Sequence, residues 1–126
     1  SIPILEDLLL SNHRCRLLSL DAAATLLVVG FVEYTIVADE CELLNIAVEG
    51  KVQGRGLGRT LLKKVLQEAQ DAGCSQCLLE VRRSNDAAIG LYVSEGFVLT
   101  GVRKGYYPAL QPRTLPEDAL LYCLQF

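Results

Sequence analysis

Three glycines and two arginines lie together in the stretch QGRGLGR, residues 53–59, where an apolar run ends and an amphipathic run begins. Gly54, Gly56 and Gly58 let a backbone approach a ligand closely and take conformations that side chains exclude. A helix beginning here would present unpaired N–H groups and the positive end of its dipole. The pattern therefore indicates an anion cradle, most naturally for a pyrophosphate. The alternative is a tight turn followed by a helix with a solvated basic face.

Other chemistries fit the sequence less well. A Walker-type phosphate loop is excluded because no Gly-Lys-Ser/Thr follows the glycines, and GxGxG is not the dinucleotide fingerprint GxGxxG. Cys74 and Cys77 have CxxC spacing, but zinc would need two more ligands, and His13 is the only histidine. Cys77 also opens a strand-like run instead of preceding a helix, as a redox CxxC would. We therefore expect no metal and no disulfide chemistry.

Length and charge set the broad class. The 126 residues suffice for one domain, and a net charge of −3 argues against direct nucleic-acid binding. No apolar run approaches the roughly 20 residues that span a bilayer. Five cysteines, an odd number, suit a reducing cytoplasm. The chain begins with Ser, lacks Met and has no cationic signal region. We therefore expect its start to be processed, trimmed or incompletely covered.

The hydrophobic pattern predicts strands and helices in alternation. Apolar residues recur at helical spacing from Leu57 to Ala69, and Gly73 follows as a plausible cap. A second helix is predicted over residues 84–96, with Ser84 or Asn85 as its N-cap. A short helix is predicted over residues 4–12. Strands are predicted over residues 14–20, 25–39 and 41–48 (the last two as a hairpin), 76–82, 97–107 and 117–126. This order indicates one mixed sheet with helices packed on it.

Several motifs together resemble one family. NIAV, QGRGLG and LEVRRSNDAAIGLYVSEGF follow one another at the spacing of the GNAT acyl-CoA N-acyltransferases, and QGRGLG fits their pyrophosphate signature, Q/R-x-x-G-x-G/A. GVRKGYYP followed by EDALLY resembles the RimI-type protein N-terminal alanine acetyltransferases. The resemblance covers residues 31–124. It implies a single GNAT domain over residues 1–126, of α/β (α+β) class, with a mixed central sheet that splays into a V and is flanked by helices.

The sequence departs from that family pattern in three places. The usual first strand and first helix are missing from the front. Gly90 lies within the second predicted helix. The loop over residues 109–116, after the paired tyrosines, is extended. Because the family's front helps form the acceptor groove, these departures bear on the acceptor more than on the fold.

The resemblance implies acetyl-CoA as co-substrate, without a metal. Its pantetheine would pair with the backbone of the NIAV strand as an added strand does. The Val48 N–H would then donate to the acetyl carbonyl as it becomes an oxyanion. The pyrophosphate would lie on the glycine turn. The implied cofactor-binding residues are Ile46, Ala47, Val48, Gln53, Gly54, Arg55, Gly56, Leu57, Gly58, Arg59 and Asn85.

Direct acetyl transfer to an amine needs a proton acceptor and a proton donor. Glu80 interrupts the apolar strand CLLEV and matches the acidic position of the RimI-type enzymes, so the resemblance makes it the base. Tyr92 matches the tyrosine that protonates the coenzyme A sulfur. A phenol can donate at neutral pH because its pKa is about 10. A solvent-facing strand residue and a buried helix tyrosine are the structural alternatives for these two positions.

The acceptor is the least determined part of the prediction. The resemblance implies a protein N-terminal α-amine, an N-terminal alanine of a small-subunit ribosomal protein, with Tyr106 and Tyr107 lining the groove. Adjacent aromatics at a strand end can equally be packing residues. Two other functions stay open: a GNAT acetyltransferase of lysine or a small-molecule amine, and a catalytically silent acyl-CoA-binding module. The oligomeric state is also open.

Overall fold

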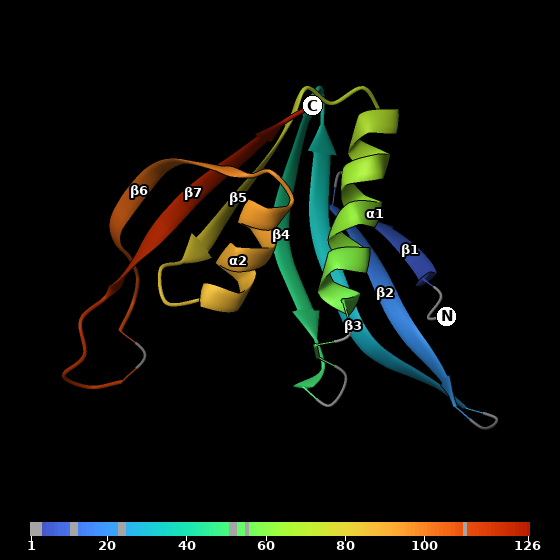
Figure 1. Cartoon of the computed structure of the whole chain (residues 1–126), viewed down its shortest axis with the longest axis horizontal. Coiled ribbons are helices and arrows are strands. Elements are labelled where there is room, and N and C mark those ends of the chain that lie inside the picture. The colour runs from blue at the N-terminus through green and yellow to red at the C-terminus, as the bar shows by residue number, and fades with distance from the viewer. Residues whose placement is uncertain (1–3, 11–12, 23–24, 51–52, 55, 110) are drawn as a thin grey trace.

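A computed structural model describes residues 4–10, 13–22, 25–50, 53–54, 56–109 and 111–126. Four strands come first, followed by a helix, a strand, a second helix and two more strands, which from residue 14 onward is the order that the hydrophobic pattern predicts (Figure 1). The elements are β1 (Ile4–Leu10), β2 (His13–Ala22), β3 (Thr25–Val37), β4 (Glu40–Val48), α1 (Leu57–Asp71), β5 (Gln76–Arg82), α2 (Asp86–Ser94), β6 (Val98–Tyr107) and β7 (Glu117–Gln125).

The strands form one mixed sheet in the order β1-β2-β3-β4-β5-β7-β6. Neighbouring strands are antiparallel except for β4 and β5, which are parallel. The parallel pairing is short: it joins residues 40–43 of β4 to residues 76–79 of β5. Beyond it the two strands diverge, and Figure 1 shows β5, β7 and β6 swinging away from β4. The predicted mixed sheet and its V-shaped splay are thereby confirmed.

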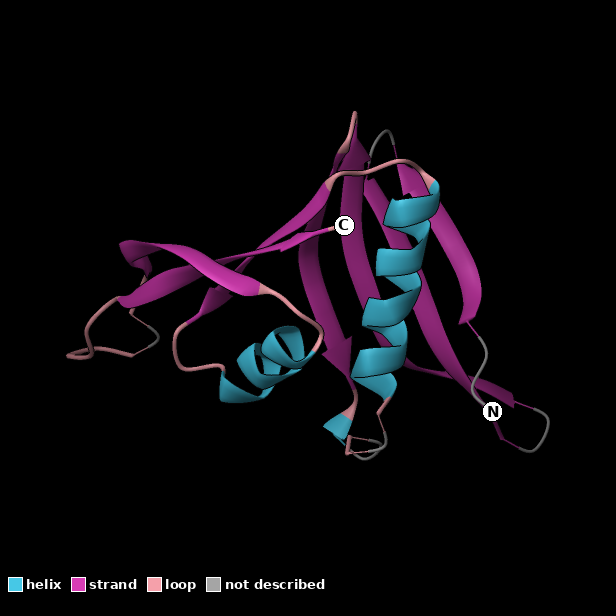
Figure 2. Cartoon of the chain, turned by 45° about the horizontal axis from the view of Figure 1, so that its top comes forward, coloured by secondary structure: helices cyan, strands magenta, loops and turns pink. Residues whose placement is uncertain are grey.

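Both helices cover the same face of the sheet (Figure 2). The apolar stripe of α1 is buried against β3 and β4, and its buried residues are Leu57, Leu61, Leu62, Val65 and Ala69. The shorter α2 contributes Tyr92 to the same core, together with Phe97 just after it. One continuous core therefore holds both helices over the region where β4 and β5 part. Within the described residues, no helix is long and apolar enough to cross a membrane.

The predicted helix ends are confirmed. Gly73, with a φ of 84°, follows the C-cap Ala72, and Gly96, with a φ of 100°, follows α2. These left-handed conformations are easy for glycine and stop each helix. At the start of α2, the Asn85 side chain accepts a hydrogen bond from the Ala88 N–H at 3.2 Å.

The helix predicted over residues 4–12 is wrong. Ile4–Leu10 is a strand that pairs antiparallel with β2. A helix of this length is marginal by itself, whereas pairing with β2 gives the segment a hydrogen-bond ladder. Leucines at positions 5, 8 and 9 have a spacing that either structure accommodates, so tertiary pairing decided between them.

A partly buried charge cluster fixes α1 to the N-terminal strands. Glu68 of α1 accepts hydrogen bonds from Tyr34 Oη at 2.6 Å, from Arg16 Nε at 3.0 Å and from Arg14. Burial raises the pKa of Glu68, but these hydrogen bonds outweigh burial and hold the pKa below its ordinary value. Burial also raises the pKa of Tyr34, so the phenol stays a donor. The cluster sets where α1, and hence the turn before it, lies on the sheet.

Candidate active site

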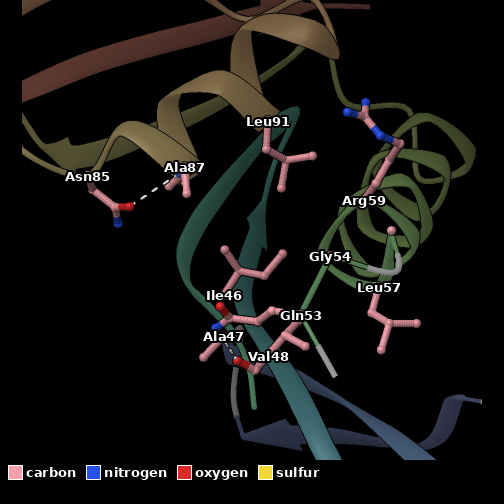
Figure 3. A pocket seen from close by; sticks show the side chains of 13 residues that line it. Ile46, Ala47, Val48, Gln53, Gly54, Leu57, Arg59, Asn85, Ala87 and Leu91 are labelled. Atoms are coloured by element: carbon pink, nitrogen blue, oxygen red, sulfur yellow. Dashed lines mark hydrogen bonds between the residues drawn. The ribbon is translucent and has the colours of Figure 1, made fainter. Parts of the chain in front are cut away.

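A pocket of about 510 Å³ lies beside the splay, between the glycine turn, the start of α1 and the start of α2. We call it the glycine-turn pocket. Its lining residues are Ile46, Ala47, Val48, Gln53, Gly54, Gly56, Leu57, Gly58, Arg59, Asn85, Ala87, Ala88 and Leu91. In Figure 3, residues 46–48 form its floor, with Asn85 and Leu91 on one side and Leu57 and Arg59 on the other.

Ten of the residues predicted to bind the cofactor line this one pocket; Arg55, also predicted, lies outside the described residues. The sequence analysis missed Ala87, Ala88 and Leu91. Their signal was present, because residues 85, 88 and 91 are three apart and share one face of the helix that Asn85 caps. Once Asn85 was placed at the pocket, this spacing would have added Ala88 and Leu91.

The glycine turn supplies a cradle made of backbone. Gly54 and Gly56 have φ values of 81° and 75°, in the left-handed region that favours glycine. Gly56 is the N-cap of α1; it has no side chain to cap the helix, and the first turn of α1 contains no acidic residue. The N–H donors and the positive end of the dipole are therefore left for an outside anion. A side chain at residue 58 would point toward α2, since an added Cβ would lie 3.5 Å from Leu91 Cδ2.

The Gln53 side chain ties the glycine turn to the end of β4. Its Nε2 donates to the Val48 carbonyl oxygen at 2.8 Å. The residue lines the pocket as predicted, but its amide serves as a strut between the floor and the turn. The Asn85 amide oxygen is likewise used in capping α2. Both polar residues thus hold the pocket's shape through hydrogen bonds within the protein.

Arg59 makes an ion pair at the pocket's edge. Its Nη1 lies 2.8 Å from Glu95 Oε1, and Lys63 Nζ lies 3.8 Å from the same oxygen. A cation in the first turn of α1 and an anion at the end of α2 each interact unfavourably with the dipole of the helix that carries them. The pair offsets both costs and links the two helices that flank the pocket.

Glu80 lies on the other side of the sheet. Cys77, Leu79 and Val81 are buried toward the helices, and Glu80 alternates with them, as the sequence predicts. It is the first β5 residue beyond the pairing with β4. With Glu42, Leu78, Leu79, Thr100, Arg103, Leu121 and Tyr122 it lines a second pocket of about 390 Å³, the Glu80 pocket. Its Oε1 lies 3.0 Å from Arg103 Nε.

Tyr92 is buried on the helix side, with 5% of its surface exposed and its ring centroid 5.7 Å from that of Phe97. Burial, with smaller contributions from Cys77 and Tyr107, raises the pKa of Tyr92 to about 12. The phenol therefore keeps its proton at neutral pH. Tyr92 is not among the residues lining either pocket, although its neighbour Leu91 lines the glycine-turn pocket. Glu80 and Tyr92 thus lie on opposite faces of β5.

Tyr106 and Tyr107 stack edge to face, with centroids 5.2 Å apart, at the end of β6. Each ring has its own arginine: Arg82 Cζ lies 4.3 Å from the Tyr107 centroid, and Arg103 Cζ lies 5.6 Å from the Tyr106 centroid. Neither tyrosine is among the lining residues of the two pockets. Through Arg103, however, Tyr106 is connected to Glu80.

Three of the cysteines are buried in the hydrophobic core. Cys41 and Cys77 face each other across the paired part of β4 and β5, both buried, and Cys74 is buried nearby. Cys41, Cys74, Cys77 and Cys123 are free thiols. Among the described parts of the chain, no three histidine, cysteine, aspartate or glutamate side chains gather as a metal-binding group.

The sequence matches the acetyltransferase (GNAT) family over residues 3–97, and the chain belongs to this family. It is an N-acetyltransferase by that membership. It is 40% identical to the ribosomal protein bS18-alanine N-acetyltransferase of Salmonella typhimurium, over 98% of this chain and 82% of that protein. It is 38% identical to the Escherichia coli enzyme of the same name, with the same coverage.

Solved structures agree with the fold. The E. coli ribosomal-protein-S18-alanine N-acetyltransferase superposes with a TM-score of 0.80 and 36% identity, over 91% of this chain and 70% of that one. A GNAT family acetyltransferase from Elizabethkingia anophelis, solved with acetyl-CoA bound, superposes with a TM-score of 0.77 over 92% of this chain and 78% of that one. At 22% identity, the second likeness bears on the fold alone.

Proposed function

We propose that this enzyme transfers the acetyl group of acetyl-CoA to the N-terminal α-amine of a protein. The acceptor that we propose is the N-terminal alanine of a small-subunit ribosomal protein. The observation that carries the proposal is the opening between β4 and β5. The glycine-turn pocket lies beside this opening on the helix side, and Glu80 lies beside it on the other face. Relatives named as bS18-alanine N-acetyltransferases, at up to 40% identity, support this acceptor and a cytoplasmic site of action.

The glycine-turn pocket fits the co-substrate. Backbone donors at the start of α1, free of an internal acid, suit a pyrophosphate. Beyond the pairing with β5, β3 is the only strand among the described residues that pairs with residues 46–48 of β4, so their backbone can pair with an extended amide chain such as pantetheine. The lining residues Gln53, Gly54, Gly56, Leu57, Gly58, Arg59 and Asn85 would surround the phosphates, and we extend this proposal to Arg55. Acetyl-CoA supplies the thioester whose acyl carbon the amine attacks.

In this proposal Glu80 and Tyr92 act from opposite faces. Glu80, at the opening, takes the proton of the ammonium group directly or through water. The Val48 N–H donates to the carbonyl oxygen as negative charge develops there. Tyr92 donates its proton to the departing sulfur, and its raised pKa keeps that proton in place at neutral pH. Tyr106 and Tyr107 would lie along the acceptor's path at the end of β6.

An α-amine suits a modest base. Its pKa is about 7.7–8.0, against about 10.4 for lysine, so part of it is already neutral near pH 7. A carboxylate acting through water is then sufficient. The clearest test is mass spectrometry of a small set of peptides after incubation with enzyme and acetyl-CoA. An Ala-starting peptide should gain one acetyl group at its α-amine, and faster turnover of an N-terminally blocked lysine peptide would overturn the α-amine assignment.

The role of Glu80 is tested by the pH profile of kcat/KM for wild type and Glu80→Gln. This substitution keeps size and hydrogen bonding but removes basicity. On the Ala peptide the deficit should be largest near neutral pH and should shrink above pH ~8, where the α-amine becomes neutral by itself. A deficit that is the same at every pH would mean that Glu80 positions the substrate and is not a base.

A further inference from the structure

Glu80 is paired with a residue from a strand that is not its neighbour. β7 lies between β5 and β6, with Glu80 opposite Leu121 and Arg103 opposite Ala119. The Arg103 side chain therefore crosses β7 diagonally to bring Nε to 3.0 Å from Glu80 Oε1. Both residues line the Glu80 pocket.

Two of the residues around this crossing are small. The register places Ala119 beside Arg103, and Gly101 lies opposite Leu121, where an added Cβ would be only 3.2 Å from Leu121 Cδ1. The Arg103 guanidinium thus lies over a part of the sheet where Ala119 and Gly101 have little or no side chain. Its Cζ is also 5.6 Å from the Tyr106 ring centroid, so the cation is bounded by the Glu80 carboxylate and an aromatic ring.

This pairing distinguishes the two oxygens of Glu80. Oε1 is taken by Arg103, whereas Oε2 has no hydrogen-bond or ion-pair partner among the described residues. A carboxylate at a strand position can rotate freely unless one oxygen is held, and a held carboxylate presents its other oxygen in a fixed direction. A proton acceptor gains from such orientation because the reacting groups then spend more time aligned.

We infer that Arg103 is a positioning residue for the reaction: it orients Glu80 so that Oε2 faces the acceptor amine, and it couples Glu80 to Tyr106 at the groove. The inference rests on the role proposed above for Glu80. It predicts that Arg103 acts only through Glu80 and not on the binding of acetyl-CoA, which enters the glycine-turn pocket on the other face.

The molecule provides a matched control. Arg83 and Asp118 form a pair at 3.3 Å with side-chain exposures of 59% and 28%, close to the 55% and 28% of Arg103 and Glu80. Neither Arg83 nor Asp118 lines the Glu80 pocket. Arg83→Gln therefore removes an ion pair of the same kind and accessibility that does not involve Glu80.

The experiment measures kcat and both KM values for wild type, Arg103→Gln, Glu80→Gln, the double variant and Arg83→Gln, with an Ala-starting peptide. Arg103→Gln should lower kcat about 10–100-fold, the size of loss that follows removal of a partner orienting a reactive ligand. The KM for acetyl-CoA should not change. Arg103→Lys, which keeps the charge but lacks Nε, should show a smaller loss in kcat. Arg83→Gln should match wild type.

The double variant decides between acting through Glu80 and acting independently. If Arg103 only positions Glu80, the double variant should be no slower than Glu80→Gln alone. If the kcat losses of the two single variants multiply in the double variant, the inference is overturned and the role of Glu80 stays intact. The same holds if Arg103→Gln is as fast as wild type. If Glu80→Gln itself keeps the wild-type kcat, the proposed base fails, and this inference fails with it.

Discussion

The glycine-turn pocket is built largely from backbone of one continuous segment and the start of a helix, whereas the Glu80 pocket is built from side chains of four strands. In the first, glycine conformations and a helix terminus create the proposed anion cradle. In the second, the arrangement depends on which side chains meet across β5, β7 and β6. Substitutions in the two pockets should therefore fail differently, one in binding and the other in turnover.

The largest effect expected is on turnover. Tyr92→Phe keeps the ring that packs against Phe97 and removes the proton. It should lower kcat by about 10²–10⁴-fold, the usual range for general-acid catalysis, with little change in acetyl-CoA affinity. Steady-state kinetics together with calorimetric titration of coenzyme A separates the two quantities. A fully active Tyr92→Phe would show that this tyrosine is a packing residue only.

A smaller effect, on binding, is expected at the cradle. Gly56→Asp places a negative charge where the phosphates would lie and strains a left-handed residue. Coenzyme A affinity should fall at least about tenfold, because like charges brought together at an interface cost several kcal/mol. Gly56→Asn is the matched control, since asparagine tolerates this conformation and carries no charge. Equal affinity of a folded Gly56→Asp variant would contradict the pyrophosphate assignment.

Substitution of the Glu68 cluster should change stability and neither pocket's chemistry. Glu68→Gln is expected to lower the free energy of unfolding by about 1–3 kcal/mol at pH 7, since it weakens partly buried hydrogen bonds to charged groups. The folded-state pKa of Glu68 is depressed, so its contribution is present above the unfolded value of about 4.3 and is lost as pH falls through the folded pKa.

Urea unfolding at pH 7 and near pH 3 measures this contribution. The gap between wild type and Glu68→Gln should shrink at the lower pH. Asp71→Asn, an exposed carboxylate-to-amide change on the same helix, should stay close to wild type at both. A gap that is equal at the two pH values would mean that the glutamate charge does not stabilise α1.

The smallest effect is expected at Glu95, which holds Arg59 at the edge of the glycine-turn pocket. Glu95→Gln removes a negative charge near the cradle and releases the arginine. Coenzyme A binding should tighten by about 0.2–1 kcal/mol, the usual worth of a partly exposed ion pair, and the gain should decrease as salt is added. Weaker binding in this variant would show that Arg59 must be held by Glu95 to serve the pocket.

The same contrast explains what the sequence could predict. A cradle made of backbone is formed by consecutive residues and gives a recognisable sequence pattern. The residues around Gly54, Gly56 and Asn85 could therefore be found without the structure. Strand alternation likewise placed Glu80 on the face of β5 away from Leu79 and Val81. Arg103 gave no such signal, because an arginine in an exposed strand has the same local pattern whether it reaches solvent or crosses β7 to a carboxylate.

Other misses have the same origin. Arg59 and Glu95, which are 36 positions apart in the sequence, pair between α1 and the end of α2, and nothing in either local pattern indicates that they meet. The strand over Ile4–Leu10 was mistaken for a helix because its partner, β2, decides its conformation. The sequence predicts what a segment prefers alone; the errors lie where a distant partner overrides or completes that preference.

The splay described above also gives the sheet an edge in its interior. From residue 45 onward the described part of β4 pairs with β3 but not with β5, although three more strands (β5, β7 and β6) lie beyond β4 in the sheet. Exposed strand edges are templates for any extended chain, and proteins commonly blunt them with charge, proline or a covering element. Here the bound co-substrate would be that cover. When coenzyme A is scarce, the same edge would be open to a wrong partner, so supply of the acetyl donor should also act as protection against self-association.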